Sequence, residues 1–326
     1  MSHQLMTEIV RGRYAPSPTG TLHMGNLRTA LLAWLFARGA GGEFILRIED
    51  LDQPRMQPRA TEQMLQDLHW LGLDWDEGPE GGPYAPYIQN ERLGIYQRYL
   101  QRLQDAGLVY PCYCSRAEIQ QAAAHLPAGV DGGARYPGTC RQLSERQRRQ
   151  YERQGRRPSL RLRVPNDTTI TFTDLVLGPQ QQQVQQAVGD FILRRADGIF
   201  AYQLAVVVDD ALMHLNQIVR GADLLSSTAR QIVLYQLLDF SVPTFAHVPL
   251  IRNEQGQKLS KRVQSAGLAP LQASNYTAED VIGLLAHSCG LRDTAEAISA
   301  AELAAYYRQR PATSLYELLR PGPHTA

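Results

Sequence analysis

Strand-like and helix-like segments alternate along most of the chain, and this alternation constrains the fold more than any other feature of the sequence. Near the start, an extended stretch runs into the Pro/Gly-rich turn PSPTG, and apolar residues then recur at helical spacing. The segments follow the order strand, helix, strand, helix, helix over residues 11–15, 25–38, 44–50, 58–71 and 91–106. This order predicts an α/β domain built around a parallel sheet.

The alternation is interrupted in the middle of the chain. Between residues 107 and 189 there are clustered cysteines, an arginine-rich run and the repetitive stretch QQQVQQ, and we interpret this part as an insertion. From Asp190 the α/β pattern resumes, with FILRR, LAVVVDD and QIVRG as expected strands and a helix capped by Ser226 or Ser227. Two short helical patterns follow, over residues 278–287 and 295–308. The predicted organisation therefore has four parts: 1–106, 107–189, 190–252 and 253–326.

Composition and charge limit the function classes. The chain has 326 residues and a formal net charge of +1, a balance that still allows a local basic patch to bind nucleic acid. Its longest apolar run, around residues 30–36, is far shorter than the roughly 20 residues that a membrane span needs. The N-terminus lacks the pattern of a secretory signal. We therefore expect a soluble, cytoplasmic protein without a membrane partner.

Several common nucleotide and hydrolase motifs are absent from the sequence. It contains no GxxxxGK[ST] loop, no GxGxxG after a strand, no HExxH and no GxSxG. The stretch PSPTGTLHMGN instead places His23 and the backbone amides of Gly25 and Asn26 at the start of a helix, where unpaired N–H groups favour anions. By itself this stretch leaves two interpretations open, phosphate binding or a histidine that only hydrogen-bonds the helix end.

Two lysines stand out in a chain that otherwise uses arginine. Lys258 and Lys261, in the segment GQKLSKR, are the only lysines of the sequence. Lysine is a compact charge on a flexible stem, whereas arginine is a planar fork. A polar loop with two ammonium groups can close over a polyphosphate and stabilise charge on a leaving pyrophosphate. The alternative is that the two lysines occur together by chance.

Three cysteines in the central region raise the question of a metal. Cys112, Cys114 and Cys140 offer three soft ligands, and a structural zinc usually takes four. Thiols of a cytosolic chain are more often reduced or metal-bound than cross-linked. Chemistry alone favours His125 as the fourth ligand, because imidazole is a common zinc ligand. Without a metal, the three cysteines would be small buried apolar residues, as we expect for Cys289.

The run over residues 141–163, RQLSERQRRQYERQGRRPSLRLR, is dense in arginine and contains little acid. A solvated helix face would explain it, and so would contact with a phosphate backbone. The run is therefore a candidate nucleic-acid contact rather than an established one.

Five stretches together resemble the glutamyl-tRNA synthetase family of class I aminoacyl-tRNA synthetases: RYAPSPTGTLHMGN, RIEDLD, VVVDD, VRGADLL and KLSKR. HMGN and KLSKR are similar to the HIGH and KMSKS signatures of that class. The stretches occur in the family's order over most of residues 11–262. The resemblance implies a Rossmann-like, parallel-sheet nucleotide-binding domain with an inserted α+β zinc-containing region and a small helical C-terminal part.

The resemblance also implies residue roles. The glutamate pocket would be formed by Arg13, Ala15, Ser17, Glu49, Tyr202 and Arg220. This set suits a dicarboxylate amino acid, because arginines bind carboxylates and an acid binds the ammonium group. ATP with Mg²⁺ would contact His23, Gly25, Asn26 and Lys261, and the catalytic residues would be His23, Lys258 and Lys261. A structural Zn²⁺ would be bound by Cys112, Cys114, Tyr136 and Cys140, because the family pattern aligns a tyrosine, not His125, with the fourth ligand.

One departure from the family pattern bears on the substrate. Only about sixty residues follow KLSKR, too few for the helical anticodon-binding region of full-length members. A chain with so short a C-terminal part resembles the short glutamyl-queuosine branch of the family. The resemblance implies that the protein activates L-glutamate with ATP and transfers it to queuosine at the anticodon wobble position of tRNA(Asp). We expect it to be a monomer. Two rival hypotheses are a truncated synthetase that charges the 3′ end of tRNA(Glu), and a non-catalytic tRNA-binding paralog.

Overall fold

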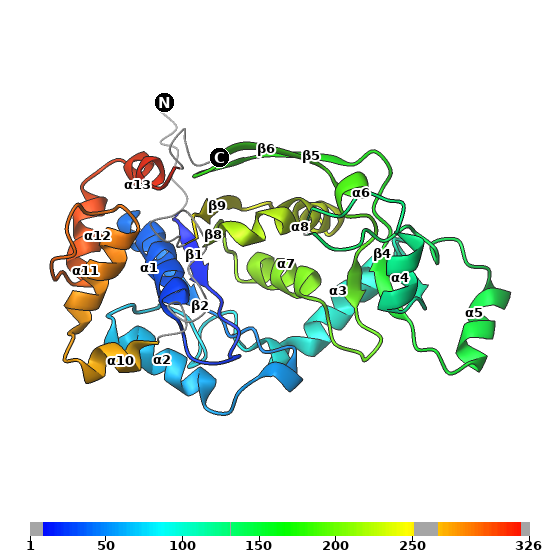
Figure 1. Ribbon diagram of the computed structural model, residues 1–326, viewed down its shortest axis with the longest axis horizontal. Helices are drawn as coiled ribbons and strands as arrows, with labels where there is room; N and C mark the ends of the chain where they lie inside the picture. Colours follow the sequence, from blue (N-terminus) through cyan, green and yellow to red (C-terminus); the bar gives the residue numbers. More distant parts are fainter. Residues whose placement is uncertain (1–8, 131, 251–266, 321–326) are drawn as a thin grey trace.

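The computed structural model describes residues 9–130, 132–250 and 267–320, and Lys258 and Lys261 lie outside these ranges. The strands are β1 (Arg11–Tyr14), β2 (Glu43–Leu46), β3 (Val109–Cys112), β4 (Ser159–Leu162), β5 (Thr169–Asp174), β6 (Gly178–Gln183), β7 (Ile192–Arg194), β8 (Gln217–Gly221) and β9 (Thr244–Val248). The helices are α1 (Met24–Gly39), α2 (Ala60–Trp70), α3 (Leu93–Asp105), α4 (Arg116–Ala122), α5 (Glu145–Arg153), α6 (Val184–Ala187), α7 (Tyr202–Leu212), α8 (Leu225–Leu237), α10 (Leu268–Ala273), α11 (Ala278–Ser288), α12 (Ala300–Arg308) and α13 (Ala312–Leu319). Figure 1 shows their arrangement.

Parallel strands form the centre of the molecule. β1 pairs with β2, β8 pairs with β9, and β9 pairs with β5, all in parallel. β1 lies beside β8, where the backbone N–H and C=O of Arg11 are hydrogen-bonded by Asn216. The order across the strands is therefore β2-β1-β8-β9-β5, with β6 as an antiparallel edge strand. The predicted α/β architecture is confirmed.

Both faces of these strands are covered by helices, as parallel strands require. Along β2, Phe44 and Leu46 belong to the core around α1, whereas Ile45 belongs to the core around α7 and α8. α1 connects β1 to β2, and α8 connects β8 to β9 in the opposite direction across the strands. Because such crossovers are right-handed, the two helices lie on opposite faces.

Most predicted elements are confirmed within a few residues. The helices predicted at 25–38, 58–71 and 91–106 are α1, α2 and α3, and the strand predicted at 217–221 is β8. The C-terminal helical patterns correspond to α11 and α12, which pack on α1. No helix within the described residues is long and apolar enough to cross a membrane.

The segment LAVVVDD is a helix, so its prediction as a strand was wrong. It forms most of α7, and every side chain from Leu204 to Asp210 is buried. β-branched residues favour strands, but a continuous apolar run does not distinguish a buried strand from a buried helix. α7 packs against α3 and α8, and this packing outweighs the weak helix propensity of its valines.

The predicted serine cap of α8 was also wrong. The helix begins one residue earlier than Ser226, directly after a 3₁₀ turn at Ala222–Leu224, and Leu224 occupies the N-cap position without a side-chain hydrogen bond. Ser227 lies inside the helix, where its hydroxyl accepts a hydrogen bond from the side chain of Gln203. The preceding turn, which the sequence pattern did not reveal, starts the helix.

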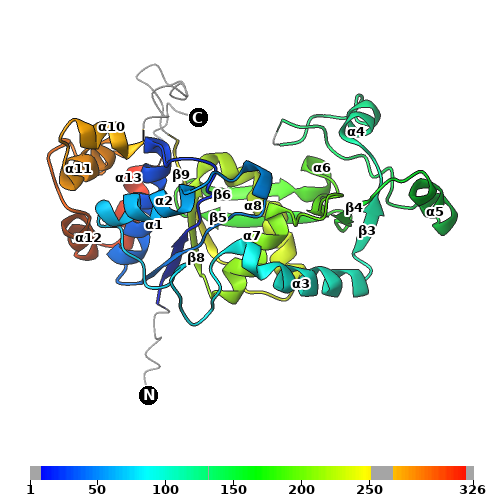
Figure 2. The ribbon, with the colours of Figure 1, turned by 90° about the horizontal axis from the view of Figure 1, so that it is seen from below.

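The central region contributes to two different sheets. β3, β4 and β7 form a separate antiparallel sheet, and α4 and α5 lie beyond it at the end of the molecule opposite to α11 and α12 (Figures 1 and 2). The hairpin of β5 and β6 instead extends the parallel strands, because Asp174 of β5 pairs with Phe245 of β9. Part of the segment that we interpreted as an insertion therefore supports the central strands.

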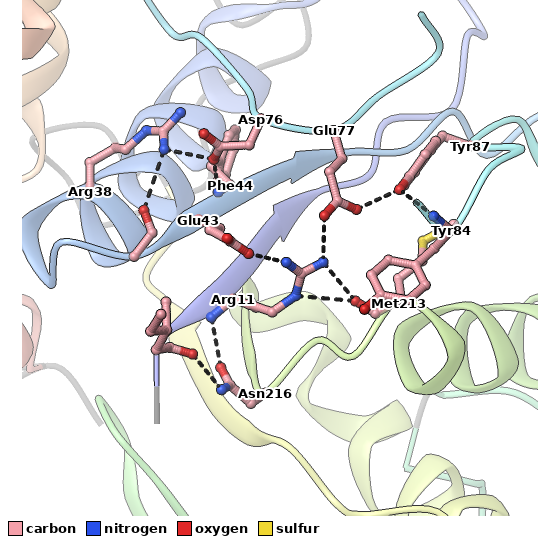
Figure 3. A network of polar contacts seen from close by, with 12 residues as sticks. Arg11, Arg38, Glu43, Phe44, Asp76, Glu77, Tyr84, Tyr87, Met213 and Asn216 are labelled. Carbon is pink, nitrogen blue, oxygen red and sulfur yellow. Dashed lines mark hydrogen bonds and ion pairs between the residues drawn. The ribbon is translucent and has the colours of Figure 1, made fainter. Parts of the chain in front are cut away.

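A network of ion pairs closes the amino ends of β1 and β2 (Figure 3). The guanidinium of Arg11 pairs with Glu43 and Glu77 and donates to the carbonyl oxygen of Met213. Tyr87 donates its hydroxyl proton to Glu77. These contacts join both strands to the end of α7, and they leave the carboxyl ends of the strands open.

Candidate active site

A cleft of about 760 Å³ opens at the carboxyl ends of β1 and β8. The chain turns outward in opposite directions after these two strands, and ligands of open α/β sheets bind at such a position. The structure brings nine predicted residues together as lining of this β1/β8 cleft: Arg13, Ala15, Ser17, His23, Gly25, Asn26, Glu49, Tyr202 and Arg220. Lys258 and Lys261 fall outside the described residues.

His23 caps the amino end of α1. Its Nδ1 accepts a hydrogen bond of 3.2 Å from the backbone N–H of Asn26, and the Asn26 side chain accepts one from the backbone of His23. Because Nδ1 is an acceptor, the proton of the neutral ring is on Nε2. Burial lowers the pKa of His23, which favours this neutral form.

The His23 cap reduces the number of unpaired backbone N–H groups that the start of α1 can donate to a ligand. The backbone N–H of Asn26 is engaged by His23, so it is not the unpaired anion-binding amide that the sequence suggested. Gly25 lies so close to the ring that a Cβ atom there would be 3.0 Å from Cε1 of His23. A glycine at this position therefore leaves room for the histidine ring.

Two buried arginines line the cleft with part of their hydrogen-bonding capacity unused. Arg220 is 3% exposed, and its Nε and Nη2 donate to His247 and Thr228, whereas its Nη1 has no partner among the described residues. Arg13 donates from Nη1 to the carbonyl oxygen of Val219, and its Nε lies 3.6 Å from Asp210. No carboxylate of the described residues lies within ion-pair distance of Arg220, so a carboxylate ligand would complete its contacts.

Glu49 reaches the cleft from a buried cluster of charges. Its carboxylate accepts a hydrogen bond of 2.9 Å from Arg47, which is fully buried and also pairs with Asp210 at 2.7 Å. Burial raises the pKa of Glu49, although Arg47 and Arg13 oppose the rise. Asp209, which directly precedes Asp210 on α7, accepts hydrogen bonds from the side chains of Arg92 at 2.6 Å, of Gln89 and of Tyr96.

The sequence analysis missed Arg47, Asp209 and Asp210 as members of this cluster. Their motifs, RIED and VVVDD, were recognised, but only Glu49 received a role. The signal lay in the acidic pair at the end of an apolar run, since buried carboxylates need cationic partners. Tyr202, at the start of α7, also lines the cleft, and burial raises its pKa.

The three central cysteines lie together at the carboxyl end of β3. The Sγ atoms of Cys112, Cys114 and Cys140 are all within 4.8 Å of one another, and we call them the cysteine cluster. The Tyr136 hydroxyl lies 3.3 Å from Cys112 Sγ and accepts from the backbone N–H of Cys140 at 2.7 Å. His125 is exposed and is not part of the cluster. Hydrogen bonding by Cys140, together with Arg161 and Tyr136, lowers the pKa of Cys112 to about 4, although burial opposes this.

The arginine-rich run divides into a structural part and an exposed part. Arg161 is buried, with its guanidinium 3.9 Å from the centre of the Tyr136 ring, and Arg163 lies over the ring of Tyr110. Arg146, Arg149 and Arg153 are exposed on α5 at a spacing that puts them on one helix face. Only Arg149 of these three forms an ion pair with another described residue, Glu145.

Comparison with known proteins gives a consistent family. A profile described as "tRNA synthetases class I (E and Q), catalytic domain" matches residues 9–306. The chain is 53% identical over 294 residues to the Glutamyl-Q tRNA(Asp) synthetase of Symbiobacterium thermophilum, covering 90% of each chain. It is 50% identical over 284 residues to the protein of the same name from Nitratidesulfovibrio vulgaris, covering 87% of each. Its similarity to Glutamate--tRNA ligase 2 of Acidithiobacillus ferrooxidans, 46% over 288 residues, covers 88% of this chain and 59% of that longer protein.

Solved structures give the same fold. A glutamate tRNA ligase from Elizabethkingia meningosepticum, in complex with its amino acid, matches with a TM-score of 0.79 and 31% identity over 94% of this chain. A glutamate-tRNA synthetase from Elizabethkingia anophelis matches with a TM-score of 0.81 and 30% identity over 98%. The chain spans 65% and 69% of these two proteins.

Proposed function

Because the chain belongs to the class I tRNA synthetase family for glutamate and glutamine, and is a ligase of the glutamate–tRNA type, we propose that it activates L-glutamate with ATP and transfers it to queuosine in tRNA(Asp). The observation that carries the proposal is the β1/β8 cleft, where buried arginines, a buried glutamate and the His23 cap line one space. Relatives of matching length carry the name Glutamyl-Q tRNA(Asp) synthetase, which supports this transfer. We further propose that it acts as a monomer in the cytoplasm.

Glutamate would bind between the arginines and Glu49. The buried Nη1 of Arg220, which has no partner among the described residues, suits one carboxylate, and Arg13 provides a second buried guanidinium. Glu49 and Tyr202 offer oxygen atoms to the ammonium group. A buried cation that lacks its counter-ion binds an anionic side chain in preference to a neutral amide. We therefore expect the site to select L-glutamate over L-glutamine.

Activation would join a glutamate carboxylate oxygen to the α-phosphorus of ATP while pyrophosphate leaves. The nucleophile is already ionised, so positioning and electrostatic stabilisation provide the catalysis. His23, with its proton on Nε2, can donate to a phosphate oxygen. Lys258 and Lys261 are proposed to hold the leaving pyrophosphate, and Mg²⁺ carried with ATP would offset phosphate charge.

Glutamate-dependent exchange of pyrophosphate into ATP, measured without tRNA, tests the activation step. We expect exchange with L-glutamate and little exchange with L-glutamine. Absence of exchange with either amino acid would favour the non-catalytic paralog, whose tRNA binding a separate assay would measure.

The cysteine cluster fits a structural zinc. Tetrahedral coordination with Zn–S bonds of about 2.3 Å places sulfur atoms about 3.8 Å apart, and an oxygen ligand about 3.5 Å from a sulfur. The observed distances are 3.5 Å between Cys114 and Cys140 and 3.3 Å between Cys112 and the Tyr136 hydroxyl. We propose that Cys112, Cys114, Cys140 and Tyr136 hold Zn²⁺ and that the metal fixes the loops around β3.

Substitution of the two competing fourth ligands tests the zinc proposal. We expect Tyr136→Phe to weaken zinc retention about 10-fold or more, because it removes one ligand and leaves the ring in place. His125→Ala should retain the metal, since His125 is exposed outside the cluster. The measurement is zinc content per chain after dialysis against a chelator series. Loss of zinc from His125→Ala with retention in Tyr136→Phe would overturn the assignment.

The exposed face of α5 is the proposed contact with the tRNA anticodon stem. α5 lies at the end of the molecule away from the C-terminal helices in both views (Figures 1 and 2). Its arginines point to phosphate binding because Arg146 and Arg153 form no ion pair with another described residue, and the pair of Arg149 with Glu145 is itself exposed, so these guanidiniums can replace counter-ions on RNA. Arg141, Arg161 and Arg163 instead have structural contacts, so we do not include them.

Replacing Arg146, Arg149 and Arg153 by glutamine should weaken tRNA binding and reduce its salt slope by about 2 to 3. Adenylate formation should be unaffected, because α5 lies outside the cleft lining. Arg310→Gln, an exposed arginine in the C-terminal part, is a matched control that should leave the slope unchanged. Equilibrium binding across a salt series gives the slope. A triple variant with the wild-type slope would remove α5 from the interface.

A further inference from the structure

Behind the β1/β8 cleft, three buried side chains form a continuous series of hydrogen bonds. Arg220 Nε donates to Nε2 of His247 at 3.0 Å, and Nδ1 of His247 lies 2.6 Å from Oδ2 of Asp174. Exposure is 3% for Arg220, 0% for His247 and 1% for Asp174, so water does not compete for these contacts. Only Arg220 of the three lines the cleft. We call this series the Asp174 relay.

The partners on both sides of the imidazole fix its protonation. Nε2 faces the N–H of Arg220 and the hydroxyl of Thr228, 3.1 Å away, and both can donate. Nδ1 faces a carboxylate, which can only accept. The ring is therefore neutral, with its proton on Nδ1. Burial lowers the pKa of His247 in agreement with this form, although Asp174 opposes the shift.

Asp174 is itself held rigidly. Its Oδ1 accepts from the backbone N–H groups of Val176 and Leu177 at 3.0 and 2.9 Å, and the backbone N–H of His247 lies 3.1 Å from both carboxylate oxygens. Asp174 ends β5, His247 lies on β9 and Arg220 on β8, so the relay crosses three neighbouring parallel strands. The β5–β6 hairpin thus reaches the cleft through side chains, not only through strand pairing.

The relay and Thr228 together engage two of the three nitrogen atoms of the Arg220 guanidinium. Nε is held by His247 and Nη2 donates to Thr228 at 2.8 Å, which fixes the plane of the group. Nη1 is left without a partner among the described residues. A charged histidine would present an N–H to the N–H of Arg220, so the neutral Nδ1–H form is what allows the contact.

We propose that Asp174 and His247 are positioning residues for glutamate, which orient the Nη1 edge of Arg220 toward the substrate carboxylate. The inference rests on the proposed function for the identity of the ligand, while the relay geometry is independent of catalysis. In this proposal the β5–β6 hairpin contributes Asp174, which holds His247 in the orientation that Arg220 needs. Arg220 alone touches substrate, and the other two act through it.

Asp174→Asn separates this role from bulk packing. An amide can keep one oxygen for the backbone N–H groups of Val176 and Leu177, but its NH₂ group then faces Nδ1 of His247 and moves the ring proton to Nε2. The Nε2–H of His247 would then face the Nε–H of Arg220, and these two donors cannot hydrogen-bond each other. We expect the Kd for L-glutamate, measured by calorimetry, to rise about 10-fold or more, with the Kd for ATP within about 2-fold of wild type. Asp239→Asn, at an exposed aspartate, is the matched control and should change neither.

The imidazole proton gives a readout that a purely structural role would not move. Long-range ¹H–¹⁵N spectra of histidine-labelled protein should show His247 neutral and protonated at Nδ1, with its signal assigned by its loss in His247→Gln. In Asp174→Asn the proton should shift to Nε2. A wild-type ring protonated at Nε2, or glutamate affinity unchanged in a folded Asp174→Asn protein, would overturn the relay. A lack of glutamate-dependent pyrophosphate exchange in wild type would refute the proposed function instead, since neither relay measurement requires catalysis.

Discussion

Replacing His23 by asparagine is expected to lower glutamate-dependent pyrophosphate exchange by about 100-fold or more while the protein remains folded. Asparagine is as good a helix N-cap as any residue, so its side chain can still accept from the N–H of Asn26. What the variant loses is the Nε2–H donor of the ring of His23, a residue that lines the cleft. The loss should appear in kcat, with the glutamate KM little changed, because His23 belongs to the proposed phosphate contacts.

His23→Ala is the companion variant for this test. It removes both the donor and the cap, and should lose activity together with about 1 kcal/mol of stability. Thermal unfolding of both variants separates the two effects. Near-normal exchange in a folded His23→Asn protein would exclude His23 from the chemistry and leave it only the capping role.

Replacing Arg47 by methionine is expected to destabilise the protein by about 3–5 kcal/mol. Arg47 is fully buried and pairs with Glu49 and Asp210, so its removal leaves buried carboxylates without their main cation. Urea unfolding at neutral pH measures the change. Arg55→Met, at an arginine that is 71% exposed, is the matched control and should cost no more than about 0.5 kcal/mol.

The pH dependence of the Arg47 variant has a defined sign. Burial raises the pKa of both Glu49 and Asp209, and Arg47 opposes the rise in each case. Without Arg47 the folded-state pKa values rise further above the unfolded ones, so the folded state gains protons and recovers stability as the pH falls toward the acid range. A stability deficit that grows on acidification, or one below about 1 kcal/mol at neutral pH, would contradict the assigned pairing.

The sequence was sufficient for the parts of the fold that follow from local patterns. α1 was predicted because its apolar spacing follows a Pro/Gly turn, and β8 because QIVRG is a short apolar run with a glycine end. α7 was not, because an apolar run buried on every side carries no periodicity that separates helix from strand. Its state is decided by packing against α3 and α8, which lie far away in the sequence.

Some residues of the candidate site could be predicted from the sequence, and others could not. The resemblance supplied Arg13, Glu49 and Arg220, and the structure places all three at one cleft. Arg47 and the Asp174 relay could not be found in the same way, because their pairing joins strands and helices that are more than 25 residues apart. At the cysteine cluster, ligand chemistry favoured His125, whereas the geometry supports Tyr136, whose hydroxyl the fold brings to the thiols.

Transfer of glutamate to queuosine is tested most directly by locating labelled glutamate on tRNA(Asp). Purified protein, ATP and labelled L-glutamate are incubated with tRNA(Asp) that carries or lacks queuosine, and nuclease digestion then separates the anticodon fragment from the 3′ fragment. We predict label in the anticodon fragment of the queuosine-bearing tRNA and none on the unmodified tRNA. Label on the 3′ fragment, or equal charging of both tRNAs, would contradict the proposed function and favour a synthetase that charges the 3′ end.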